Sequence, residues 1–401
     1  MVNSRCKWIG LALLGLHAAG AWAQADASYY PYYLGASQTV THDSYMARYG
    51  GVGQDWISTT GLRAGADRRF GAQQLLGNAS VGRNVYKNNS LLDNTEYAVD
   101  GRLNWASVER LSGLLALQSG QSLYKNTLTA QALGRSLLRT DGATASAQLG
   151  VVTAWSFDTG LSTSRQRVSG GAATQLANLN TDQHMVSSGV RWAPTTDLSL
   201  RLGARRARGR LPSFGDDFTR NDVDLSGNVA FSGSSSFFAR VSSTRLSHSV
   251  AGLTNLRGWT GLLGANWQPS GKLTLGVTAS RDSNLGSVNQ TGQLIGQSLN
   301  TNGALSSAVG LTASWAVTAA LSLDSRIGYL QRTLQSSLSS TDGKDSITSL
   351  SMGLRHTPYR NLELGCGFTI DDHRVQQVNP AYAVGPYNAR AFNCSGQAFL
   401  R

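Results

Sequence analysis

The chain has 401 residues, of which 41% are hydrophobic and only 14% are charged, and its formal net charge is +12. Soluble domains usually carry about 25% charged residues, and a content of 9 Trp, 13 Tyr and 10 Phe excludes a disordered chain. Past the N-terminal segment, no apolar run approaches the ~18 residues that a transmembrane helix needs. The composition therefore favours strands with one apolar and one weakly polar face.

The first 23 residues have the features of an export signal. Arg5 and Lys7 precede a short apolar stretch at residues 8–20, and Ala21 and Ala23 are small residues where a signal peptidase would cleave. We therefore expect a signal peptide at residues 1–23 and a mature chain that begins at Gln24 with a net charge of +10. Export argues against nucleic acid as a partner.

A short pattern, an aromatic residue followed six positions later by leucine, recurs along the mature chain. Its five full copies are Trp105–Leu111, Trp155–Leu161, Trp192–Leu198, Trp267–Leu273 and Trp315–Leu321, and its variants are Phe70–Leu75, Phe231–Phe237 and His356–Leu362. The copies lie about 35 to 50 residues apart, which is enough for two strands and one long loop. We expect a tight turn at each of the eight positions.

Residues of alternating polarity flank these turns. Val99 and Leu103 alternate with Asp100 and Arg102, and the same alternation follows the turns as far as Leu273–Ala279. A strict period of two indicates strands with two different faces. A soluble β-sandwich with edge tryptophans is the alternative, but it would need polar outer faces.

Counting the turns gives the architecture. Eight turns join sixteen strands, and further strands are expected at residues 33–42 and 392–400, which makes about eighteen. We therefore predict an all-β fold: a transmembrane, antiparallel outer-membrane β-barrel over residues 24–401, with both termini on the periplasmic side. The predicted location is the outer membrane of a Gram-negative bacterium, as a monomer or a trimer.

The tryptophans at the tight turns predict one aromatic girdle at the membrane–water interface, because indole rings prefer that boundary. The girdle residues are Trp105, Trp155, Trp192, Trp267 and Trp315. Long connections, including residues 208–222, are expected outside the cell. Two of them, 125–142 and 282–303, are the candidates for a loop that folds into the lumen.

The N-terminal quarter resembles a known family. Tyr33–Ser44, Trp56–Gly65 and Gly77–Tyr86, together with the closing Cys394–Arg401, are similar to outer-membrane β-barrel porins found with exopolysaccharide clusters of Gram-negative bacteria, the EpsL-like proteins. The family usually has Asn soon after the Asp-Ser of the first loop, where this chain has Tyr45. The resemblance implies a surface-polysaccharide context and supplies no catalytic residues.

Arginines concentrate around one expected hairpin. Arg191, Arg201 and Arg205 share the face opposite the aliphatic residues, so they form a candidate basic stripe in the lumen that would favour anions. The alternative is that they pair with Asp100, Asp224, Asp324 or Glu363. Arg206 has the outward register, which suits contact with lipopolysaccharide phosphates.

Two cysteines remain in the mature chain, Cys366 and Cys394, both in the outward register of expected neighbouring strands. They form a disulfide if they fall directly opposite each other, with Cα atoms within ~7 Å. Otherwise they are two separate apolar side chains that face lipid.

No motif of catalysis is found in the sequence. It contains no nucleophile elbow, phosphate loop or metal-spaced His/Cys cluster, so we predict no enzyme, no metal and no cofactor. The expected partners are outer-membrane lipid, lipopolysaccharide and the insertion machinery, with exopolysaccharide and export-machinery proteins as candidates.

The predicted function is a pore or platform associated with exopolysaccharide biosynthesis and export. Two alternatives stay open. One is a general diffusion porin for small, preferably anionic, solutes. The other is a closed structural barrel whose surface loops bind polysaccharide or partner proteins.

Overall fold

The structure is a computed structural model, and it describes residues 31–44, 53–107, 110–124, 135–150, 153–170, 180–250, 255–283, 285, 305–334, 343–377 and 386–400. The expected signal peptide lies outside these residues. No helix in the described part of the chain has the length and apolar character needed to cross a membrane.

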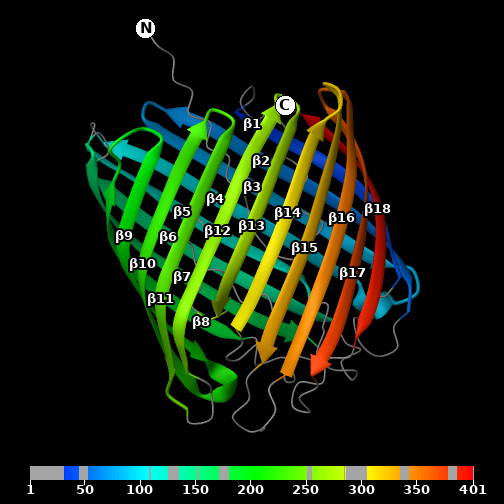
Figure 1. Ribbon diagram of the computed structural model, residues 1–401. Helices are drawn as coiled ribbons and strands as arrows, with labels where there is room; N and C mark the ends of the chain where they lie inside the picture. The colour runs from blue at the N-terminus through cyan, green and yellow to red at the C-terminus, as the bar shows by residue number, and fades with distance from the viewer. Residues whose placement is uncertain are drawn as a thin grey trace.

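Eighteen strands form one sheet, and each is antiparallel to its neighbours in the chain (Figure 1). The strands are β1 (Tyr32–Asp43), β2 (Asp55–Phe70), β3 (Gln73–Tyr86), β4 (Asn94–Ser107), β5 (Leu111–Leu123), β6 (Ser136–Leu149), β7 (Trp155–Gly170), β8 (Thr181–Trp192), β9 (Leu198–Leu211), β10 (Asp216–Ser232), β11 (Ser235–His248), β12 (Leu256–Ser270), β13 (Leu273–Ser283), β14 (Leu305–Ala316), β15 (Leu321–Leu334), β16 (Gly343–Tyr359), β17 (Leu362–Gln377) and β18 (Tyr387–Leu400). Two short 3-10 helices, η1 (Ser90–Leu92) and η3 (Pro212–Phe214), lie in the connections.

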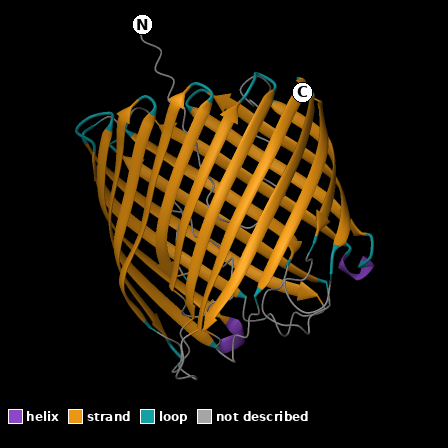
Figure 2. Ribbon diagram, turned by 45° about the vertical axis from the view of Figure 1, so that its right-hand side comes forward, coloured by secondary structure: helices purple, strands orange, loops and turns teal. Residues whose placement is uncertain are grey.

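The first and last strands pair and close the barrel. The β1–β18 register runs from Leu34 opposite Leu400 to Asp43 opposite Ala391. Figure 2 shows the front strands crossing the back strands at an angle, as in a closed barrel. Closure removes the unpaired strand edges that hydrocarbon could not hydrate.

Phe399 packs across this closure on the lumen side. The sequence places it one residue from the outward-facing Leu400, and only 6% of Phe399 is exposed. Its ring meets Tyr33 of β1 edge to face, with the ring centroids 5.9 Å apart. A Cβ added to Gly35 would lie 2.7 Å from the Phe399 ring, so a glycine is needed beneath it.

The two ends of the barrel differ in their connections. At the end where β1 begins and β18 ends, all eight connections are short, and seven of them lie at positions that the sequence predicted. The turn expected at Trp155–Leu161 is wrong, because β6 ends at Leu149 and β7 begins at Trp155, so that this copy of the pattern follows its turn. We call this the turn end, at the top of Figure 1, and the opposite end the loop end. The predicted fold class, a closed antiparallel barrel of about eighteen strands, is confirmed.

The prediction of a long loop at residues 208–222 is wrong. Residues 208–222 are mostly strand, because β9 continues to Leu211 and β10 begins at Asp216, with only η3 and Gly215 between them. Arg210 of β9 lies opposite Asp217 of β10, and Arg210 Nε is 3.0 Å from Asp217 Oδ1. Opposite charges across a strand pair favour pairing even without aliphatic side chains. Likewise, β6 begins at Ser136, inside the expected loop 125–142.

Candidate functional site

The alternation of side chains divides the barrel into an outer face and a lumen. Leu161, Leu202 and Leu225 point outward and are about 60% exposed, as is usual for lipid-facing residues. Residues of the other register, such as Arg205 on β9 and Asp224 on β10, point into the lumen and are buried. The lumen is polar and the outer face is apolar, which is the distribution of a membrane barrel.

The three arginines of the predicted stripe all face the lumen. Arg191 of β8 and Arg201 of β9 lie opposite each other in register. Arg201 binds Asp158 of β7, with Nη2 2.6 Å from Oδ2. Arg205 binds Asp224, with Nη2 2.8 Å from Oδ1. No described carboxylate forms a salt bridge with Arg191, so it alone of the stripe keeps an uncompensated charge.

Two glycines allow Arg201 to reach Asp158 across the intervening strand. A Cβ at Gly189 of β8 would lie 2.6 Å from Arg201 Cζ, and a Cβ at Gly203 would lie 2.3 Å from its Nη1. The guanidinium therefore lies flat on the wall of the lumen. Sequence reasoning named Asp224 as a partner for the stripe but missed Asp158, because this pair depends on the register of three strands.

A buried ion network spans β9 to β13 in the loop-end half of the lumen. Arg220 of β10 is fully buried and donates from Nε to Asp222 (2.9 Å) and from Nη1 to Asp282 of β13 (2.7 Å). Asp222 also lies 3.4 Å from Arg205 Nη2. Each charge has an opposite partner, so the network ties the strands from β9 to β13 together.

The connection after β13 begins by turning into the lumen. Its Leu285 is buried against three lumen-facing side chains of β9 to β11, which are Leu211, Phe218 and Leu246. The Leu285 carbonyl accepts a hydrogen bond from Arg220 Nη1 at 3.0 Å. Residues 282–303 were one of the two candidates for a loop that folds into the lumen, and Leu285, at the start of this connection, does lie inside the lumen. The rest of it, and residues 125–134 of the other candidate, lie outside the described part.

A second buried ion network lies across the barrel. Arg332 of β15 donates from Nε to Asp345 of β16 at 2.8 Å, and His373 Nε2 of β17 is 3.1 Å from the same carboxylate. All three side chains are at most 5% exposed. The loop-end half of the lumen is therefore densely packed on both sides.

The turn-end half of the lumen is more open. Arg102 of β4 and Arg326 of β15 point inward and are exposed, and no described carboxylate forms a salt bridge with either. Asp324 is held by the Ser314 hydroxyl at 2.6 Å. Arg102, Arg191 and Arg326 are thus exposed or half-exposed guanidiniums that water reaches, and Arg355 of β16, which donates to the Ser322 hydroxyl, is a further one in this half.

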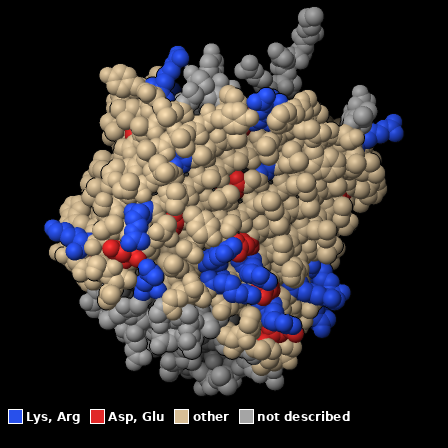
Figure 3. Space-filling view, turned by 180° about the vertical axis from the view of Figure 1, so that it is seen from behind, with Lys and Arg blue, Asp and Glu red and all other residues tan. Residues whose placement is uncertain are grey.

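Most of the basic excess lies outside the lumen. The outward-facing arginines near the loop end, among the described residues, are Arg83, Arg139, Arg165, Arg167, Arg206, Arg208, Arg210, Arg245, Arg257, Arg281, Arg374 and Arg390. Figure 3 shows blue side chains gathered toward this end, below a band that is mostly tan. The net charge of the sequence therefore overstates the positive charge in the pore.

The predicted girdle tryptophans all lie near the turn end of their strands, on the outer face. Trp155, Trp267 and Trp315 are about half exposed. Trp155 and Trp192 are directly opposite in register, with ring centroids 6.1 Å apart. The Trp105 ring lies over Gly113, where a Cβ would be 2.4 Å from it.

The two cysteines are directly opposite in the β17–β18 register. Their Cα atoms are 4.1 Å apart, and the structure joins Cys366 and Cys394 through their Sγ atoms. The geometric condition stated for the sequence is met. We predict that the two thiols are oxidised to this disulfide in the purified protein.

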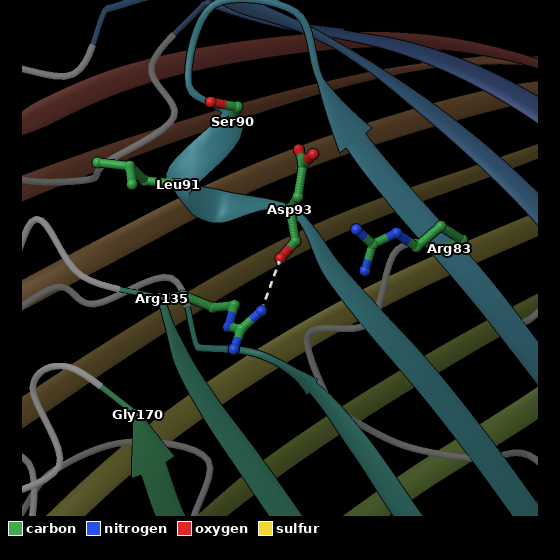
Figure 4. Close-up of a pocket in the computed structure, with 6 residues that line it drawn as sticks. All are labelled: Arg83, Ser90, Leu91, Asp93, Arg135 and Gly170. Carbon is green, nitrogen blue, oxygen red and sulfur yellow. Dashed lines mark hydrogen bonds between the residues drawn. The ribbon is translucent and has the colours of Figure 1, made fainter.

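A shallow pocket lies at the loop-end rim between the β3–β4 connection and the start of β6 (Figure 4). Arg83 and Arg135 point toward each other across it. Arg135 donates to the Asp93 carbonyl at 3.3 Å, and Arg83 has only a long contact to the Thr95 hydroxyl at 3.5 Å. The pocket is basic but lies outside the lumen, so it is no part of a pore.

No protein-family model matches the chain, and no curated protein matches it in sequence. Several solved structures match it in fold. Pseudomonas aeruginosa OccK2 (OpdF) is 13% identical, with a TM-score of 0.50 over 92% of this chain and 97% of that chain. The structure of OccK2 in complex with glucuronate is 13% identical, with a TM-score of 0.50 over 92% of this chain and 98% of that chain. Acinetobacter baumannii OccAB3 is 11% identical, with a TM-score of 0.48 over 92% of this chain and 99% of that chain. The chain has the fold of an 18-stranded outer-membrane porin. This barrel is a protein of the cell outer membrane, as predicted, since its apolar outer face requires lipid.

Among the described residues, no group of three or more His, Cys, Asp or Glu side chains is arranged to hold a metal ion. The lumen is therefore the main candidate for the functional site.

Proposed function

We propose that this chain is a passive diffusion channel of the outer membrane for small hydrophilic solutes, with a weak preference for anions. The observation that carries the proposal is the turn-end half of the lumen, where Arg102, Arg191 and Arg326 have no salt-bridge partner among the described carboxylates. A barrel of 16–18 strands is wide enough to leave an aqueous channel. Guanidiniums that line such a channel favour anions.

The loop-end half supports small solutes over polymer chains. The ion network of Arg220 and the inward Leu285 occupy the wall there, on the path that an exported polysaccharide would need. The preference for anions should be weak, because Arg201 and Arg205 are neutralised by Asp158 and Asp224. We therefore favour the diffusion porin, which was an alternative in the sequence analysis, over the exopolysaccharide pore, which was the main prediction.

Small carboxylated sugars are the solute class that we would test first. The structure of OccK2, similar in fold, was determined in complex with glucuronate. A uronate has one carboxylate, which a guanidinium can bind through two parallel hydrogen bonds. Arg102, Arg191 and Arg326 are the groups that we expect a uronate to meet from the turn end.

The exopolysaccharide role remains the second candidate function, supported by the resemblance of the N-terminal quarter to EpsL-like porins. In that case polysaccharide and export-machinery proteins would bind the surface loops. We further propose that residues 1–23 are removed on export and that the turn end is periplasmic, because the short turns of bacterial barrels face the periplasm.

The test is single-channel recording of the refolded mature protein under a salt gradient. Wild type should pass an ohmic current with a reversal potential on the anion side, and glucuronate should block it partially. R102Q/R191Q/R326Q should lower the anion-to-cation permeability ratio by about twofold or more, because three lumen charges are lost.

The matched control is D158N/R201Q, which removes one charge of each sign from the same lumen and should leave the permeability ratio unchanged. Equal selectivity of wild type and the triple variant would contradict the anion preference. A folded, heat-modifiable barrel without conductance would contradict the channel itself and favour the loop-binding alternative.

A further inference from the structure

Five arginines gather on the outer face of two strands near the loop end. They are Arg165 and Arg167 of β7 and Arg206, Arg208 and Arg210 of β9, and we call them the outer arginine patch. The strand between them, β8, presents Asp182, His184 and Val186 on the same face. The register places Arg165, Asp182 and Arg210 in one row across the three strands, followed toward the turn end by Thr163, His184 and Arg208.

The height of the patch matches the edge of the membrane. Trp192 at the turn end lies opposite Leu200 of β9. With a rise of about 3.3 Å per residue and a tilt of about 40°, Arg206, Arg208 and Arg210 lie about 15, 20 and 25 Å above that level. The apolar band of such a barrel is about 25 Å tall. Arg210 therefore lies at the upper edge of this band, and Arg208 and Arg206 lie about 5 and 10 Å below it, from where their long side chains extend toward the headgroup layer.

The patch is only partly neutralised. Arg165 Nε is 2.9 Å from Asp182 Oδ1, and Arg167 Nη2 is 2.5 Å from Asp182 Oδ2. Arg210 is bound to Asp217. Arg206 and Arg208 are exposed, and neither forms a salt bridge with any described residue. Five guanidiniums thus face two carboxylates, and the two free ones lie nearest the acyl region.

The outer face becomes largely apolar toward the turn end. Leu161 and Val186 share the row of Arg206, the next row holds small residues such as Ser188 and Ala204, and the row after that brings together Phe157, Val190 and Leu202. A ligand of this surface would therefore have an anionic headgroup above and hydrocarbon below. An inorganic anion would use only the upper part.

We propose that the outer arginine patch binds the phosphate groups of lipopolysaccharide in the outer leaflet, with its acyl chains on the apolar rows below. Arginine binds phosphate through paired hydrogen bonds, with both charge and geometry in its favour. Arg206 and Arg208 receive one phosphate, and Arg165 and Arg210 flank it. This site lies on the side of the wall opposite the lumen, so it is independent of the proposed channel.

The proposal is tested by native mass spectrometry of the refolded full mature chain in detergent, titrated with bisphosphorylated lipid A. Wild type should retain lipid A at concentrations at which monophosphorylated lipid A and phosphatidylglycerol bind weakly. R206Q/R208Q should weaken lipid A binding at least about tenfold, because the two unpaired guanidiniums are lost. Inorganic pyrophosphate is the second probe, and it tests whether the patch binds a free anion instead of a lipid.

The control is R68Q/R360Q, which removes the same charge from exposed positions at the turn end and should bind lipid A as wild type does. Unchanged conductance shows that both variants fold. Equal lipid A affinity of R206Q/R208Q and wild type would overturn the proposal. Pyrophosphate binding as tight as that of lipid A, and lost in the same variant, would overturn the lipid assignment.

Discussion

Replacing Arg220 with methionine is expected to lower the free energy of unfolding by about 3–5 kcal/mol. Arg220 is fully buried and donates to Asp222, to Asp282 and to the Leu285 carbonyl. Methionine fills a similar volume but donates no hydrogen bond, so two carboxylates would stay in a packed region without their main counter-charge. Removing one member of a buried ion network costs more than the network contributes to stability.

Urea-induced unfolding of the refolded barrel in lipid vesicles, followed by tryptophan fluorescence, would measure this loss. The control is R245M, on the neighbouring β11, where Arg245 faces outward and is exposed. That change should cost less than about 1 kcal/mol. R220K should fall between the two, because an ammonium keeps the charge but lacks the fork that reaches Asp222 and Asp282 together. A loss for R220M no larger than for R245M would show that the network contributes little to stability.

The same variant tests whether Arg220 anchors the inward connection. Arg220 Nη1 holds the Leu285 carbonyl against the wall of β9 to β11. If that contact fixes the start of the connection, R220M channels should show more current fluctuation than wild type at equal voltage, while R245M channels should not. Stability and current noise are separate readouts, so a variant that refolds poorly can still be examined channel by channel.

The barrel could be predicted because its outer face obeys one simple rule. Lipid requires an apolar side chain at every second position, so Leu198, Leu200 and Leu202 reveal both a strand and its orientation. An aromatic of the recurring pattern marked the end of the strand before seven of the eight turns, and Trp155 marked the start of the strand after the remaining one. Eight such marks fixed the number of strands, because each tight turn joins two of them.

The lumen could not be predicted in the same way. Lumen residues do not have to be apolar, so their pairing depends on strand register and on the size of the neighbours. Arg201 reaches Asp158 only because Gly189 and Gly203 leave room on the wall. Arg332 and His373 meet at Asp345 although they come from strands on either side of it. The sequence offered no signal that these charges are mutually neutralised.

The end of β9 shows the limit of hydropathy. Past Leu202 the outward positions of this strand are Ala204, Arg206, Arg208 and Arg210, so the apolar rule stops while the strand continues. The strand persists because both neighbours supply partners, with Asp182 on one side and Asp217 on the other side of Arg210. An outward arginine run therefore marks the end of the hydrocarbon layer and not the end of the strand.

Replacing both Cys366 and Cys394 with serine is expected to lower the free energy of unfolding by about 3–4 kcal/mol, as the chain-entropy model gives for a loop of this length. The two residues are separated by 28 positions and are directly opposite on β17 and β18. A covalent bond there limits the freedom of the unfolded C-terminal hairpin. Because β18 also pairs with β1, we expect the variant to refold into vesicles with a lower yield.

Thiol labelling and urea unfolding together test whether Cys366 and Cys394 are joined and whether the bond stabilises the barrel. Denatured wild type should take up a thiol reagent only after reduction, and reduced wild type should unfold at the same urea concentration as C366S/C394S. The single variant C366S is the matched control, since it leaves one free thiol on the outer face and should be as unstable as the double variant. If wild type is labelled fully without reductant and unfolds alike with and without it, the cysteines are two separate lipid-facing side chains. The closure between β18 and β1 would then depend on backbone pairing and on the packing of Phe399 against Tyr33.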